Sequence, residues 1–244
     1  MEVKMKADNI SERPWQNIFE KYFSQMIQNN ATHETKTGPY ISISRDFGCK
    51  ANDIARKLSS ELASQSSGSG GDREWKWINK EILHESARAL DLSPSKIRYV
   101  FLSEKKSVMD EIIGAMSTRY YKSDMKIRNT IIEVIRTIAR SGHVIIVGRG
   151  GVAFAGDNPQ SLHVKLIAPM DWRIARISKN YGKTREEALQ YIRKIDRERK
   201  HLIDSFVGHE TDHSIFDMIL NRKTMSEKCI VDSIIHAARD RSLI

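Results

Sequence analysis

The sequence predicts an α/β fold, a three-layer sandwich in which helices cover both faces of a five-stranded parallel sheet. Short, almost continuously apolar runs recur along the chain, as expected of strands that are buried on both faces. Segments with helical periodicity separate these runs, and the crossovers of a parallel sheet need such segments. The 244 residues, 40% hydrophobic and 29% charged, suffice for one real core with small appendages.

Five runs are expected to form the strands of this sheet. The most apolar of them are rich in Ile and Val, whereas the second and the last are weaker. In chain order the expected strands are Tyr40–Ser44, Trp75–Ile78, His143–Val147, Leu162–Ile167 and Phe216–Leu220.

The carboxyl ends of parallel strands meet at one edge of a sheet, and ligands of open α/β proteins bind beyond that edge. Three segments qualify by this criterion: the loop after Ser44, the glycine-rich turn 148–151, and the residues after Ile167. We expect all three to line one cleft.

Helices are expected between and around the strands. The better defined ones cover 51–63, 124–140, 184–205 and 226–239, with others opening at Asn79, Ser93 and Ser103. Thr184 and Glu187 match the capping box that begins a helix. An amphipathic helix over Pro14–Asn30 precedes the first strand, so residues 1–38 are interpreted as a helical extension of a main domain, 39–244.

The net charge of +9 and a pI near 9.5 admit two kinds of partner, nucleic acid or small phosphorylated molecules. Lys and Arg are spread along the chain among acids, and even the densest cluster, 193–200, is interrupted by Asp and Glu. This distribution favours small phosphate ligands and leaves polymer binding open. No apolar stretch of membrane-spanning length or secretory segment occurs, and two cysteines suggest a reducing cytoplasm.

A candidate phosphate loop follows the first strand, in the segment ISISRDFGCKANDIARKL. Such loops surround phosphate oxygens with backbone N–H groups and a helix N-terminus. Against the pattern G-x-x-x-x-G-K-[ST], Arg45 and Lys50 replace the glycines, and Ala51 and Asn52 stand where Lys and Ser/Thr belong. The segment is therefore either a degenerate phosphate loop or an ordinary strand-to-helix turn. The Ser/Gly run 65–71 follows a helix, not a strand, and is rejected as the phosphate loop.

Several segments in order resemble the cytidylate kinase-like family. Ser44-Arg45, Gly48 and Ile54-Ala55 match its opening pattern, S-R-x-x-G-S-G-G-x-x-I-A. VIIVGRGG and the following strand and helix resemble its Gly-Arg turn and its later arginine pair, and Asp196-x-x-Arg199 resembles its lid signature. FDMILN is similar to its closing strand. The resemblance covers roughly Tyr40–Arg239.

The resemblance implies a P-loop nucleoside monophosphate kinase-like fold, with a helical monophosphate-binding arm over 79–140 and a lid over 184–205. It implies transfer of the γ-phosphoryl group of ATP to a nucleoside monophosphate, CMP or dCMP by default, with Mg²⁺ arriving with ATP and no metal ligand assigned to the protein. Positioning and charge stabilisation, largely by arginines, would do most of the work. A nucleotide-binding pseudokinase and a basic nucleic-acid-binding module remain alternatives, and the N-terminal helix is a candidate homodimer surface.

The implied site residues form three groups. The donor's phosphates would lie on Arg45, Gly48, Cys49, Lys50, Ala51, Asn52 and Asp53. The acceptor would lie on Arg149 and Arg176. The implied catalytic residues are Arg173, Arg193, Arg197 and Arg199, which would neutralise the transferring group, and Asp196, which would position the lid arginines.

Overall fold

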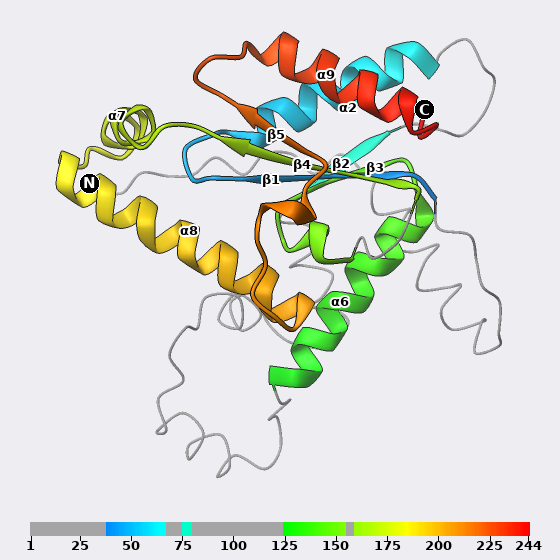
Figure 1. Cartoon of the computed structure of the whole chain (residues 1–244), viewed down its shortest axis with the longest axis horizontal. Coiled ribbons are helices and arrows are strands. Elements are labelled where there is room, and N and C mark those ends of the chain that lie inside the picture. Colours follow the sequence, from blue (N-terminus) through cyan, green and yellow to red (C-terminus); the bar gives the residue numbers. More distant parts are fainter. Residues whose placement is uncertain (1–37, 67–74, 80–123, 155–158) are drawn as a thin grey trace, which may run out of the picture. The chain divides into compact units, whose positions relative to one another are not determined.

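The structure, a computed structural model, describes residues 38–66, 75–79, 124–154 and 159–244 (Figure 1). All of these belong to one compact unit, Lys36–Ile244. The helix predicted over Pro14–Asn30, most of the Ser/Gly run, and the helices predicted to open at Asn79, Ser93 and Ser103 lie outside the described residues.

The described strands form the predicted five-stranded parallel sheet. Its order is β2-β3-β1-β4-β5, and every neighbouring pair is parallel. Because β1 lies in the middle, its carboxyl end is flanked by the ends of β3 and β4. The strands are β1 Tyr40–Arg45, β2 Lys76–Ile78, β3 Val144–Val147, β4 Ser161–Ile167 and β5 Met218–Asn221.

Helices cover both faces of the sheet, which confirms the three-layer prediction. α2 (Ala51–Ser66) and α9 (Glu227–Asp240) lie on one face, and α6 (Asp124–Ser141) and α8 (Arg185–Val207) lie on the other (Figure 1). Alternate residues of the central strands divide between these faces, as the pleat requires. The larger core lies under α2 and α9 and includes Ile41, Ile43, Val164, Leu166, Leu58 and Ile234.

The predicted lid, 184–205, falls on α8, which forms a helical hairpin with α7 (Met170–Tyr181). Gly182 ends α7 in the left-handed conformation, and the predicted capping box of Thr184 and Glu187 begins α8. A small apolar cluster of Ile174, Ile177, Ala188 and Ile192 joins the two helices. Among the helices that the structure describes, none is long and apolar enough to cross a membrane.

The last strand differs from its prediction. It begins at Met218, two residues later than expected, because Phe216 and Asp217 have other partners. The N–H of Phe216 closes a short 3-10 turn, His213–Ile215, and the ring of Phe216 lies under the ammonium of Lys165. Asp217 accepts a hydrogen bond from the N–H of His163. The run interpreted as a strand therefore begins with Phe216, which lines a pocket.

Candidate phosphate site at the carboxyl ends of the strands

A pocket of about 130 Å³ opens at the carboxyl ends of β1 and β3 and runs under α8. Two of the three predicted segments line it: the loop after Ser44 and the turn after Val147. The residues after Ile167 do not line it. One of them, Arg173, pairs with Asp46 and Asp196, which do. Its wall consists of Ser44, Arg45, Asp46, Gly148, Arg149, Gly150, Lys165, Asp196, Arg199, Lys200, Leu202, Ile203, Thr211, Asp212, His213, Ile215 and Phe216.

Arg45 packs its guanidinium group against the backbone of Gly148. Gly148 has φ +69°, and a Cβ there would lie 1.8 Å from Nη1 of Arg45, so a side chain at this position would displace the guanidinium group. Burial and the charges of Arg199 and Arg149 lower the pKa of Arg45 to about 9, which leaves the group charged at neutral pH. The positive charges of Arg199 and Arg149 therefore repel that of Arg45 within one pocket, and a bound anion would offset this repulsion.

Arg149 is held in a strained turn. Its φ is +57°, between Gly148 at +69° and Gly150 at +70°, and a non-glycine residue in this conformation costs on the order of 1–3 kcal/mol. The turn fits only because Gly150 lacks a side chain, since a Cβ there would meet the ring of Phe206 at 2.4 Å. The packing of α8 thus holds Arg149 at the pocket wall.

Arg199 belongs to the lid helix but is fixed on the loop. Its Nη1 donates to the carbonyl oxygen of Arg45 at 3.1 Å, and its guanidinium carbon lies 5.3 Å from the ring centre of Phe47. Burial lowers the pKa of Arg199, while the nearby carboxylates of Asp196 and Asp46 oppose that shift. Its place in the pocket is therefore set jointly by the loop and the lid.

Asp196 ties the loop to the lid. One carboxylate oxygen accepts from the N–H of Phe47 at 2.6 Å, and the other accepts from Nη1 of Arg173 at 2.5 Å. Arg173 is buried and also donates to the carbonyl oxygens of Ala168 and Phe47. The ring of Phe47 packs on the α7–α8 cluster, with Tyr191 at 5.2 Å between ring centres. The carboxylate of Asp196 is thus the hydrogen-bond acceptor of one backbone N–H of the candidate phosphate loop.

Asp46 and Lys165 face each other across the base of the loop. Nζ of Lys165 lies 3.9 Å from a carboxylate oxygen of Asp46 and 3.4 Å from Nε2 of His213. Nη2 of Arg173 lies 3.8 Å from the other carboxylate oxygen. Burial and the charge of Asp196 raise the pKa of Asp46 against the opposing effect of these cations.

The predicted loop residues divide by environment. Gly48 has φ +99° and lies against Arg173, and the N–H of Cys49 donates to the carbonyl oxygen of Asp46. Burial raises the pKa of Cys49 to about 12, so this side chain is a core thiol and not a thiolate. Lys50 is exposed and Ala51 is buried.

Asn52 and Asp53, the last two predicted loop residues, are bound to neighbours. The side-chain oxygen of Asn52 accepts from Asn79 at 3.1 Å, and Asp53 pairs with Arg56 at 3.2 Å. Both residues lie in the first turn of α2, which leaves the backbone of that turn as their contribution to anion binding.

The predicted arginines divide as well. Arg149 and Arg199 line the pocket, whereas Arg193 and Arg197 lie on the exposed side of α8. Arg176 stacks over the ring of Trp172 at 4.5 Å and is not part of the pocket wall. Arg193, Arg197 and Arg199 span nearly two turns of α8, and a repeat of 3.6 residues cannot direct all three side chains to one cleft.

The sequence analysis missed several contributors, among them Asp46, Phe47, Lys165 and the wall residues within 200–216. The strand β4 carried a signal for one of them. His163 and Lys165 alternate with Leu162, Val164 and Leu166, so one face of a buried strand is polar. The others carried no local signal.

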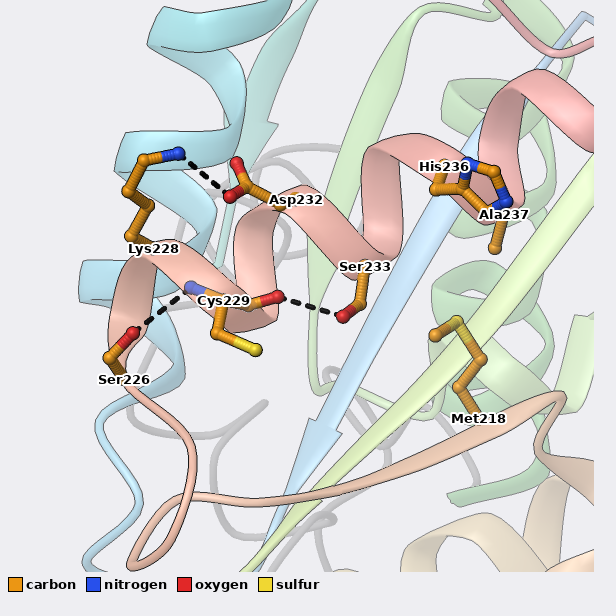
Figure 2. Close-up of a pocket in the computed structure, with 8 residues that line it drawn as sticks. All are labelled: Met218, Ser226, Lys228, Cys229, Asp232, Ser233, His236 and Ala237. Atoms are coloured by element: carbon orange, nitrogen blue, oxygen red, sulfur yellow. Dashed lines mark hydrogen bonds and ion pairs between the residues drawn. The ribbon is translucent and has the colours of Figure 1, made fainter.

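A second hollow lies on the outer side of α9, where Met218 of β5 faces the helix (Figure 2). Four of its polar side chains pair within α9 or at its N-terminus. Nζ of Lys228 lies 2.7 Å from Asp232, and Ser226 and Ser233 bond to the backbone of Cys229. It shares no residue with the arginine pocket, which remains the candidate site.

A five-stranded parallel sheet in this order, with a strand–turn–helix and converging arginines at its carboxyl edge, has the architecture of the P-loop kinase fold. The family model described as "Cytidylate kinase-like family" matches residues 40–224, most of the chain. The chain belongs to the cytidylate kinase-like family, as its motifs predicted.

An uncharacterized protein from Eubacterium ventriosum has the same fold, with a TM-score of 0.57 at 19% identity over 83% of this chain and 98% of that one. A shikimate kinase from Bacteroides thetaiotaomicron aligns with a TM-score of 0.42 at 13% identity, covering 84% and 99% of the two chains. A uronate isomerase from Corynebacterium glutamicum is 25% identical over 130 residues, 53% of this chain. The chain spans about a quarter of the length of that curated relative, since the match covers 24% of it.

Proposed function

We propose that this protein transfers the γ-phosphoryl group of ATP to a nucleoside monophosphate, with CMP or dCMP as the acceptor. The observation that carries the proposal is the convergence of Arg45, Arg149 and Arg199 in one pocket at the carboxyl edge of the sheet. Guanidinium groups bind phosphate oxygens in a fork and keep their charge at every physiological pH. Such a cluster suits a phosphoryl group whose charge is spread over several oxygens.

The roles follow from the placement of these residues. Arg149, at the end of β3, would hold the acceptor's phosphate, while the loop backbone and the first turn of α2 would hold the donor's. Arg199 joins the lid to the loop, so closing the lid on substrate would bring it to the transferring group. Asp196 and Arg173 would position that lid. The reaction belongs in the cytoplasm, where the two free cysteines stay reduced.

Mg²⁺ is expected to arrive with ATP, and the pocket fits a shared ion. Magnesium in kinase sites is held by one or two carboxylates together with substrate phosphates. Within the described residues no group of three His, Cys, Asp or Glu side chains forms a metal cage. Asp46 fits the shared role, since its carboxylate has only distant cations, whereas that of Asp196 is bonded to Phe47 and Arg173. When bound, Mg²⁺ would neutralise charge on the phosphates.

A second function, nucleotide binding without turnover, is favoured by one observation. The carboxylate of Asp196 already occupies the N–H of Phe47, an amide that an active phosphate loop would offer to its donor. Together with the missing lysine, this contact describes a pseudokinase whose lid stays on its loop. In that case ATP would bind while the acceptor remained unchanged.

The test is an assay of ADP release with ATP, Mg²⁺ and each nucleoside monophosphate in turn, alongside calorimetry of ATP binding. We expect slow formation of CDP or dCDP. ATP binding without product from any acceptor would instead support nucleotide binding without turnover, the pseudokinase function. Binding of neither nucleotide, with salt-dependent binding of RNA or DNA, would favour the nucleic-acid module.

A further inference from the structure

The phosphate loop supplies no lysine of its own to the donor. Ala51, in the position of the usual lysine, is 2% exposed and packs into the core. Lys50, the nearest cation in sequence, is exposed and has a left-handed backbone, with φ +48°. The guanidinium group of Arg45 lies against Gly148, at the end of β3, and so on the side of Arg149. A donor carrying several negative charges needs another cation.

Lys165 meets that need by its position. It stands beside Ser44 in the β1–β4 register, at the base of the loop, and its side chain is 20% exposed in the pocket. The ring of Phe216 lies 5.4 Å from Nζ and shields it from water. A cation on a central strand, partly shielded in this way, acts on nearby charge more strongly than an exposed one.

The contacts of Lys165 leave donor capacity for a ligand. An ammonium group has three N–H donors. Its Nζ lies 3.4 Å from Nε2 of His213 and 3.9 Å from a carboxylate oxygen of Asp46, both longer than the roughly 2.7–2.9 Å of a strong charge-assisted hydrogen bond. A phosphate oxygen at the loop would therefore give Lys165 a better partner than either.

We infer that Lys165 is the donor-binding lysine of this protein, contacting the polyphosphate of ATP from strand β4 in place of the lysine that the loop lacks. The inference rests on the proposed nucleotide binding and deepens it. It divides the cations into two groups: Lys165 at the loop for the donor, and Arg45 with Arg149 at the end of β3 for the acceptor. Arg199 of α8 lines the same pocket.

The experiment measures the affinity for ATP with Mg²⁺ and for CMP by calorimetry, in the wild-type protein and in Lys165→Met, Lys165→Arg and Lys228→Met. Met keeps the length of the side chain and removes its charge. We expect Lys165→Met to weaken ATP binding by about tenfold or more, with CMP binding unchanged. Lys165→Arg should restore most of the loss. The control, Lys228→Met, removes an exposed charge from α9 and should leave both affinities unchanged.

The outcomes separate this inference from the proposed function. If the wild-type protein binds neither nucleotide, the proposed function fails. If it binds both and Lys165→Met binds ATP as tightly as the control, the function stands and the role of Lys165 is refuted. Reductive methylation of wild-type lysines gives a measurement that needs no variant. ATP should protect Lys165 and not Lys228, and equal labelling of Lys165 with and without ATP would also overturn the inference.

Discussion

Replacing Asp196 with alanine should loosen the lid from the phosphate loop and destabilise the whole domain. The carboxylate accepts two short hydrogen bonds, from the N–H of Phe47 and from the buried guanidinium of Arg173. Each such bond to a charged group contributes about 1.5–3 kcal/mol. The side chain is 26% exposed, so water replaces part of the loss, and Arg173 retains the carbonyl oxygen of Ala168 as an acceptor.

We therefore expect Asp196→Ala to lower the free energy of unfolding by about 2–4 kcal/mol. For a protein of this size that corresponds to a fall in Tm of roughly 4–16 °C. Urea unfolding followed by circular dichroism measures the change directly. The stability of Asp196→Asn should lie between those of Asp196→Ala and the wild type. An amide oxygen can still accept the hydrogen bond from Phe47, but a neutral amide no longer balances the charge of Arg173.

The matched control is Asp171→Ala, which also removes an aspartate from an arginine pair. Asp171 lies 2.6 Å from Arg185 but is 79% exposed, and exposed pairs contribute within about 1 kcal/mol. If Asp196→Ala and Asp171→Ala lower stability equally, Asp196 does not join the loop to the lid. The reasoning about the fixed position of Arg199 would then fail with it.

Three further predictions concern the same domain. Arg149→Ala should weaken CMP binding about tenfold or more and leave ATP binding nearly unchanged by calorimetry, whereas equal losses would make Arg149 a support of the sheet edge. Gly150→Ala should cost about 2–4 kcal/mol, through its left-handed backbone and the clash with Phe206, whereas Gly182→Ala, left-handed with open space, should cost only about 1 kcal/mol in the same urea titration. Burial lowers the pKa of His163 from 6.5 to about 4. Between these values the unfolded chain binds a proton at His163 and the folded chain does not, so the free energy of unfolding should fall by about 2–3 kcal/mol between pH 7 and 4.5. His163→Asn should flatten that fall, and an unchanged pH dependence would assign it to other groups.

Local patterns predicted most of the fold. The apolar runs of β1, β3 and β4 and the capping box of Thr184 are readable because strand burial and helix capping depend on near neighbours in the chain. The Gly-Arg turn was readable for the same reason. The edge strand β5 was predicted two residues early because Phe216 is apolar but lines the pocket. Local hydrophobicity does not distinguish a residue of a strand from a residue of a pocket wall.

The sequence by itself determined the fold class, the family and the edge of the sheet at which a ligand would bind. Only the tertiary structure decided which cations meet there. Arg199 and Arg193 are both arginines of one lid helix, yet Arg199 lies on the loop and Arg193 on the exposed side. Lys165 lies beside Asp46 although 119 positions separate them in the chain. Such pairings depend on the register of β1 against β4 and on the packing of α8, which are set by the whole core and not by any local pattern.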